Sequence, residues 1–129
     1  MKNSLESGIK NVRNVGRYIF RSGAIQELSG ILCNRRRHAG NQVVFLVDQF
    51  FEVNPTPLGE LPYETNDQIV YVATEDEPTT EFIDSVTEEI IAKGGREACT
   101  VVGIGGGTTL DTAKAVSNIL TNGGNAATY

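Results

Sequence analysis

Histidine and cysteine are scarce in this sequence, which has one histidine, His38, and two cysteines, Cys33 and Cys99. The cysteines lie far apart and in no C-x-x-C pattern, so they favour reduced, partly buried thiols over a disulfide framework or a catalytic thiol. A chain of 129 residues is long enough for one domain and can bury a core without disulfides. We therefore expect a single cytoplasmic domain with reduced thiols.

Basic residues and long apolar runs are also lacking. The chain has 16 Asp and Glu against 11 Lys and Arg, a net charge of −5, which argues against a general nucleic-acid or anionic-membrane surface. Its first ten residues include no apolar segment of a signal peptide, and its apolar runs are too short to span a bilayer. We expect no nucleic-acid or membrane partner.

What is present is an alternation of strand-like and helix-like segments. Runs of β-branched and other apolar residues predict strands, the first two buried on both faces, at 42–47, 68–73 and 100–104. Apolar residues at helical spacing and stop signals such as Gly94-Gly95 predict helices at 24–32, from about 78 to 93 and at about 109–120. The proline-containing segment 51–67 predicts a long loop with at most a turn of helix. Such alternation implies an α/β fold with a parallel sheet and flanking helices.

The most informative stretch joins the last strand to the last helix through three glycines, Gly105, Gly106 and Gly107. Glycines remove the Cβ atoms that would hold a ligand away, and the free N–H groups at the start of a helix attract anions such as a pyrophosphate. The stretch is not a G-x-G-x-x-G fingerprint, because Thr108 stands where the last glycine would be, and it has no Gly-Lys-Ser/Thr of a Walker A loop.

Residues 105–114 read Gly-Gly-Gly-Thr-Thr-Leu-Asp-Thr-Ala-Lys. This stretch resembles the glycine motif of the iron-containing (group III) alcohol dehydrogenases, including the glycerol dehydrogenases, within the dehydroquinate synthase-like superfamily. The resemblance implies a Rossmann-like N-terminal domain that binds NAD. Dehydroquinate synthases, which are lyases, typically have Gly-Asp-Leu-Ala-Gly after the glycines, so the motif sides with the dehydrogenases. The segment from 51 to 80 is similar to the subgroup that oxidises the terminal carbon of eight-carbon ulosonic acids.

Six residues are predicted to bind the cofactor: Asp48, Gly105, Gly106, Gly107, Thr108 and Asp111. The glycines and Thr108 would hold the pyrophosphate. Asp48 follows a predicted strand, where a carboxylate can accept hydrogen bonds from the adenosine ribose and repel a 2′-phosphate, which favours NAD over NADP; alternatively it only initiates a loop. Asp111 has two compatible roles, closing a Thr108-x-x-Asp111 capping box and, by the resemblance, lying near the nicotinamide amide.

Three other charged segments favour structural roles. Lys114 is expected to form a salt bridge or to pack its stem on the sheet, rather than to contact phosphate. Arg35-Arg36-Arg37-His38 predicts a solvated loop or a helix C-terminus more than a phosphate or partner site. Glu75-Asp76-Glu77 predicts the acidic start of a helix, and Glu77 stands where many family members have an asparagine near the adenine.

The single histidine limits what the resemblance implies. The family holds a divalent metal, iron or zinc, with one Asp and three His from a helical C-terminal domain, so we expect no metal ligands and no catalytic residues in this chain. Residues 1–129 are predicted to be an incomplete N-terminal NAD(P)-binding domain of an alcohol or sugar dehydrogenase, inactive alone. An open sheet edge predicts a homo-oligomer. The alternatives are a non-catalytic nucleotide-binding or oligomerisation module and a dehydroquinate synthase-like lyase fragment.

Overall fold

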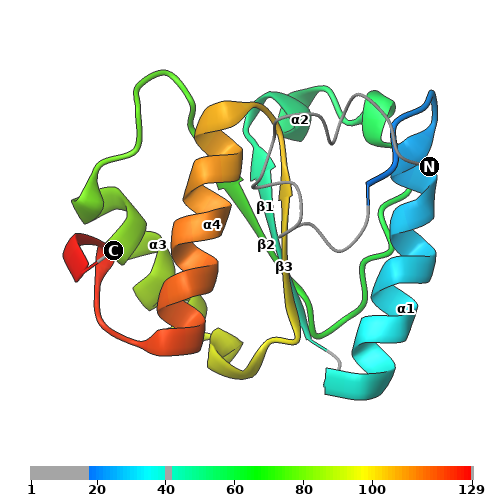
Figure 1. Cartoon of the computed structure of the whole chain (residues 1–129). Helices are drawn as coiled ribbons and strands as arrows, with labels where there is room; N and C mark the ends of the chain where they lie inside the picture. The colour runs from blue at the N-terminus through cyan, green and yellow to red at the C-terminus, as the bar shows by residue number, and fades with distance from the viewer. Residues whose placement is uncertain (1–17, 40–41, 129) are drawn as a thin grey trace, which may run out of the picture.

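A computed structural model describes residues 18–39 and 42–128. The described chain forms three layers, with a parallel sheet between helix α1 on one face and helices α3 and α4 on the other (Figure 1). The strands are β1 (Val43–Asp48), β2 (Gln68–Val72) and β3 (Thr100–Ile104), in the order β2-β1-β3. The predicted α/β, Rossmann-like class is confirmed.

The central strand β1 is buried along both faces, as its uninterrupted apolar sequence predicts. Val44 and Leu46 pack on one face with residues of α3 and α4, whereas Phe45 and Val47 pack on the other face with Leu32 of α1. The prediction of full burial for β2 is wrong. This strand lies at an edge, pairs only with β1 and is exposed at Tyr71, because burial depends on neighbours that a single run of residues does not specify.

Helix α1 covers Leu28–Ala39 and follows a short 3-10 turn, η2 (Ala24–Glu27). The helix is longer at its C-terminal end than the predicted 24–32, so Arg35, Arg36 and Arg37 lie on its last turns and not in a solvated loop. Tertiary contacts hold this extension. Arg36 reaches Asp67 before β2, and Arg35 donates to the carbonyl of Cys99 at the start of β3.

The connection from β1 to β2 contains a single-turn helix, α2 (Phe50–Val53), and a 3-10 turn, η3 (Thr56–Leu58). This confirms the prediction of a long loop with one turn of helix. Its apolar residues cover the α1 face of the sheet, where Phe51, Leu58 and Leu61 pack against the cluster around Phe45.

Helix α3 (Thr80–Ala92) begins two residues after Pro78, and the Thr79 hydroxyl accepts a hydrogen bond from the Phe82 N–H. This start corrects the predicted one, because a threonine N-cap satisfies a free donor that a proline at the first position would not. The predicted stop is confirmed, since Gly94 has a left-handed φ of 89° and leads into η4 (Gly95–Glu97).

Helix α4 (Gly107–Asn122) starts inside the glycine cluster and is followed by η5 (Ala126–Thr128). Its axis passes close to β3 because Gly103 has no side chain: a Cβ there would lie 2.8 Å from the Cβ of Ala113. Within residues 18–39 and 42–128, no helix is long and apolar enough to cross a membrane.

Candidate functional site

The carboxyl ends of β1 and β3 meet at a point where the chain leaves the sheet in two directions. Val47 pairs with Ile104, and the next residues, Asp48 and Gly105, lie beside each other. From β1 the chain continues over the α1 face, whereas from β3 it enters α4 on the opposite face (Figure 1). In open α/β sheets the crevice outside such a switch point is where ligands bind.

Gly105 is the residue that makes this junction tight. Its φ is +153°, which side chains other than glycine rarely adopt, and a Cβ would lie 2.8 Å from the Thr109 hydroxyl and 2.9 Å from the Cβ of Asp48. The glycine therefore lets the end of β3 lie against both β1 and the first turn of α4. This role is structural, behind the crevice.

Gly106 and Gly107 face open space instead. A Cβ on either glycine would meet no atom within 4 Å. Gly106 is the N-cap of α4, and the first hydrogen bond of the helix runs from Leu110 N–H to Gly106 C=O at 3.0 Å. The N–H groups of residues 107–109 therefore have no carbonyl within the helix to receive them, and no side chain caps the helix. This uncapped start carries the positive end of the helix dipole.

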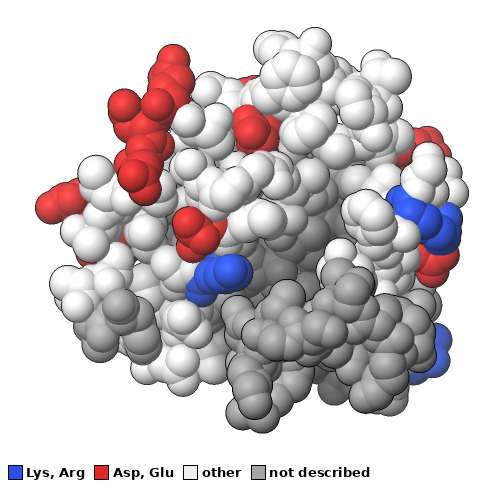
Figure 2. All heavy atoms as spheres, turned by 45° about the horizontal axis from the view of Figure 1, so that its top comes forward, with Lys and Arg blue, Asp and Glu red and all other residues white. Residues whose placement is uncertain are grey.

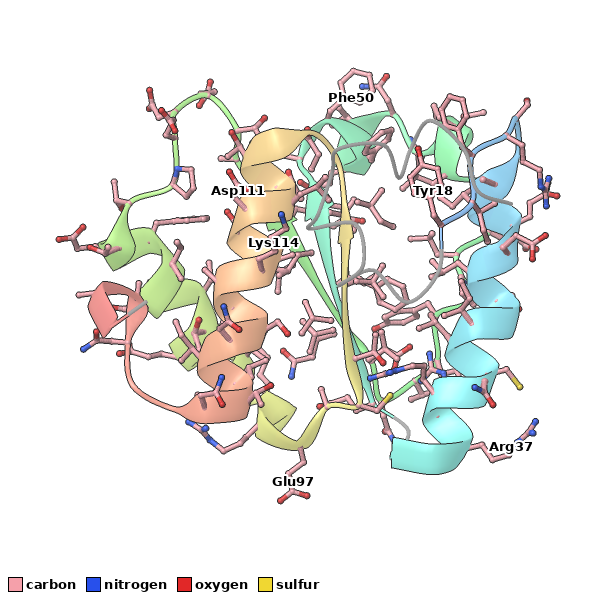
Figure 3. The ribbon with its side chains drawn as sticks, viewed as in Figure 1. Tyr18, Arg37, Phe50, Glu97, Asp111 and Lys114 are labelled. Atoms are coloured by element: carbon pink, nitrogen blue, oxygen red, sulfur yellow. The ribbon has the colours of Figure 1, made fainter. Side chains whose placement is uncertain are left out.

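The predicted capping box is wrong. Thr108 is the second residue of α4 and not its N-cap, and its carbonyl accepts a hydrogen bond from the Thr112 hydroxyl at 2.8 Å. The three glycines allow the helix to start one turn earlier than the threonine pattern suggests. Asp111 consequently lies beyond the first turn, exposed, rather than reaching back to close it (Figure 3).

Thr109 was missed by the sequence reasoning. Its side chain is fully buried, and its hydroxyl is one of two buried side-chain polar atoms in the described chain that have no hydrogen-bond partner. Buried polar groups are nearly always paired, so this hydroxyl is an exception directly behind the glycine turn. The sequence offered one signal, a second threonine next to the motif, but nothing that distinguished its buried side chain from the neighbouring Thr108.

Asp48 is the last residue of β1 and is half-buried. Its Oδ1 accepts hydrogen bonds from the Phe50 N–H at 2.9 Å and from the Thr74 hydroxyl at 3.5 Å. The loop-initiating role is therefore present. The other oxygen, Oδ2, has no hydrogen-bond partner in the described part of the chain, so one acceptor remains for another group.

Acidic side chains surround this edge of the sheet. Figure 2 shows a group of them over the loop that joins β2 to α3, and Glu75, Asp76 and Glu77 line a small cavity of about 230 Å³ there, beside Phe82. These three residues precede the Thr79 cap, so they lie before the helix rather than in its first turn as predicted. Their field opposes a highly charged anion near the end of β2.

A comparison with known families agrees with the geometry. The model of the family described as iron-containing alcohol dehydrogenase matches residues 16–129, almost the whole chain. The chain belongs to the iron-containing alcohol dehydrogenase family. The match confirms the resemblance predicted from residues 105–114 and indicates an alcohol dehydrogenase-like oxidoreductase domain.

In this family member the charged residues outside the glycine turn have different surroundings from those predicted. Lys114 is exposed on α4 and forms no ion pair within residues 18–39 and 42–128, so the expected salt bridge is not found (Figure 3). The side chain of His38 lies outside the described residues.

Arg36 differs most from its prediction. Its guanidinium forms a two-pronged ion pair with Asp67, with Nη1–Oδ1 at 2.9 Å and Nη2–Oδ2 at 2.6 Å, and the Asp67 side chain is completely buried. Burial raises the pKa of this carboxyl, but hydrogen bonds from Arg36 and from the backbone N–H groups of Glu64 and Val43 more than offset it, and the pKa falls below its ordinary value. The pair ties α1 to the start of β2.

Metal ligation does not fit the described residues. They contain no group of three or more His, Cys, Asp or Glu side chains that could hold a metal ion. The family generally uses NAD and a divalent metal, and of these two groups only the nucleotide has a fitting place, at the uncapped start of α4.

Proposed function

We propose that this chain is the N-terminal, NAD-binding part of a metal-dependent alcohol or sugar dehydrogenase. The observation that carries the proposal is the uncapped start of α4, which opens onto the switch-point crevice beside Asp48. When bound, NAD accepts a hydride from the hydroxyl-bearing carbon of the substrate. The residues of this chain bind and orient the cofactor, and in this proposal none of them reacts.

The pyrophosphate is assigned to the first turn of α4. The N–H groups of Gly107, Thr108 and Thr109 would donate to its oxygens, helped by the helix dipole. Gly106 and Gly107 leave the space into which the diphosphate must come, because no protein atom lies within 4 Å of either missing Cβ. Thr108, half-buried at the second position of the helix, adds its hydroxyl.

The adenosine ribose is assigned to Asp48. Oδ1 is held by the Phe50 N–H, which fixes the carboxylate, and Oδ2 is the acceptor that remains for a ribose hydroxyl. A 2′-phosphate at the same place would meet Asp48, so NAD is preferred over NADP. Asp111, exposed on α4, is assigned to the nicotinamide end on the strength of the family resemblance.

The metal and the substrate are assigned to another part of the protein. With one histidine in the sequence and no metal-ligating group among the described residues, we derive no catalytic step through a metal here. This assignment agrees with a catalytic centre shared between two domains, and it predicts that the 129-residue chain alone does not oxidise alcohols.

The proposal is tested by calorimetric titration of the full chain with NAD, NADP and ADP-ribose. We expect NAD and ADP-ribose to bind and NADP to bind more weakly. A chain that is folded by circular dichroism and binds none of the three would contradict the proposal.

A pair of glycine variants locates the site. Gly107→Val places a side chain in the open space before the α4 start, and we expect NAD affinity to fall at least about tenfold, since one or more charge-assisted hydrogen bonds are lost. Gly30→Val is the matched control, because Gly30 also lies in a helix with no atom within 4 Å of its missing Cβ. Equal NAD affinities of the two variants would remove the pyrophosphate from the glycine turn.

A single charge substitution tests the cofactor preference. Asp48→Asn retains an Oδ1 that can accept from the Phe50 N–H but removes the charge. We expect the ratio of NADP to NAD affinity to rise by about tenfold, equivalent to about 1.4 kcal/mol. An unchanged ratio would remove Asp48 from its assigned role while leaving the pyrophosphate site intact.

A further inference from the structure

A second polar cavity lies at the opposite end of β3 from the glycine turn. It has a volume of about 420 Å³ and is lined by two arginines, Arg35 and Arg96, together with the hydroxyl residues Thr100, Ser117 and Thr121. Thr100 is the first residue of β3, whereas the glycine turn follows the last one. The two sites are therefore separated by the full length of the strand.

The cavity is positively charged in an acidic protein. Its lining includes no aspartate or glutamate, whereas the chain as a whole has a net charge of −5. The neighbouring Glu97 points away from the sheet, at the bottom of the molecule in Figure 3. The C-terminal ends of α1 and α4 lie close by and contribute about half a negative charge each, so the two guanidinium groups leave about one positive charge in excess.

Arg35 is held in a fixed orientation. Its Nε donates to the Thr100 hydroxyl oxygen at 2.9 Å, and its Nη2 donates to the Cys99 carbonyl at 3.0 Å. These bonds leave Nη1 and its two protons for another acceptor. An arginine fixed by its neighbours loses less side-chain entropy when it binds a ligand.

Arg96 supplies a second cation. It lies in η4, is exposed and forms no ion pair within the described chain. Ser117 and Thr121 are four residues apart on α4, so their side chains lie on the same face of the helix, toward the cavity. Four elements that are distant in sequence thus bring two guanidinium groups and three hydroxyls to one place.

We propose that this cavity binds a small dianion, either a phosphate monoester or a dicarboxylate. Guanidinium groups recognise the oxygens of both ligands with paired hydrogen bonds, and the hydroxyls can donate to the remaining oxygens. The volume accommodates a ligand larger than inorganic phosphate. The site is independent of the nucleotide site proposed above and would remain if that proposal failed.

The test is a titration of the ¹⁵N-labelled full chain with inorganic phosphate at constant ionic strength, followed by amide chemical shifts. Saturable shifts are expected at the amides of Thr100, Ser117 and Thr121. Shifts at Gly106 and Gly107 report anion binding at the glycine turn and are fitted separately. Parallel titrations with glycerol phosphate and with succinate decide between the two kinds of dianion, since the preferred one binds more tightly than inorganic phosphate.

Two arginine variants distinguish a built site from general attraction. Arg96→Gln is expected to weaken phosphate binding at the cavity at least about tenfold, because one charge-assisted contact is lost. Arg37→Gln removes the same charge from an exposed arginine that points away from the cavity, and binding should stay within about twofold (Figure 3). No saturable shift at the cavity amides with any of the three anions, or equal losses in the two variants, would overturn the proposal.

Discussion

The substitution Gly105→Ala tests how the junction between β3 and α4 is built. The new Cβ would lie 2.8 Å from the Thr109 hydroxyl and 2.9 Å from the Cβ atoms of Asp48 and Thr109. Overpacking of this kind costs about 1–3 kcal/mol. The φ of +153° adds about 1–3 kcal/mol of backbone strain for a residue with a side chain.

One term opposes this loss. Alanine restricts the unfolded chain more than glycine does, which stabilises the folded state by about 0.4–1 kcal/mol. The net expectation is a decrease of about 2–4 kcal/mol in the free energy of unfolding. With a urea m value of about 1–3 kcal/mol/M, the midpoint of unfolding should fall by roughly 1–3 M.

The assay is urea unfolding followed by circular dichroism, with Gly107→Ala as the control. Gly107 is the first residue of α4, and its missing Cβ meets no atom within 4 Å, so alanine there should leave stability unchanged or raise it by up to about 1 kcal/mol. A Gly105→Ala variant as stable as Gly107→Ala would falsify the reasoning, because it would mean that the junction relaxes without loss.

Three further predictions concern other parts of the molecule. Thr109→Val replaces a buried, unpartnered hydroxyl with a methyl group of similar shape, and the free energy of unfolding without ligand should rise by about 1 kcal/mol in urea; a loss of stability would mean that the hydroxyl has a partner in solution. Asp67→Asn leaves the Arg36 charge buried without a counter-ion, and thermal and urea unfolding should show a loss of about 3–5 kcal/mol. Since the folded pKa of Asp67 is lowered, its contribution is complete well above the ordinary value of about 3.9 and disappears as the pH falls through the folded pKa; wild-type stability should therefore decrease more steeply than that of Asp67→Asn below about pH 4, and parallel pH profiles would contradict this. The sheet edge at β3, which pairs only with β1 among the described strands, should make the chain self-associate, and light scattering after gel filtration should give a mass above 13.9 kDa; a monomer at all concentrations would contradict it.

Several elements could be predicted from the sequence because local physics specifies them. The buried run of β1 has no polar residue until Asp48, and Gly94 provides the left-handed stop of α3. The glycine turn was predictable for the same reason, since bare backbone between an apolar strand and a helix leaves few other uses. The family match over residues 16–129 confirms what this motif indicated.

Other features could not be predicted because they depend on partners distant in the chain. The sequence placed Arg36 in a solvated loop, whereas the fold buries it against Asp67, 31 residues away. Charged side chains are usually exposed, and only a paired geometry offsets their desolvation, so the pattern of one segment does not reveal such a pair. The anion cavity at Arg35 and Arg96 also combines residues from four separate elements.

The sequence by itself determined the alternation of strands and helices, the position of the glycine turn and the family, because each follows from backbone freedom and apolar spacing over a few residues. Only the tertiary structure decided what each glycine does. Gly105 is enclosed by Asp48 and Thr109, whereas Gly106 and Gly107 face open space, although the three are adjacent and chemically identical. The difference arises from the strand order β2-β1-β3, which brings the end of β1 against one side of the turn and leaves the other side to a ligand.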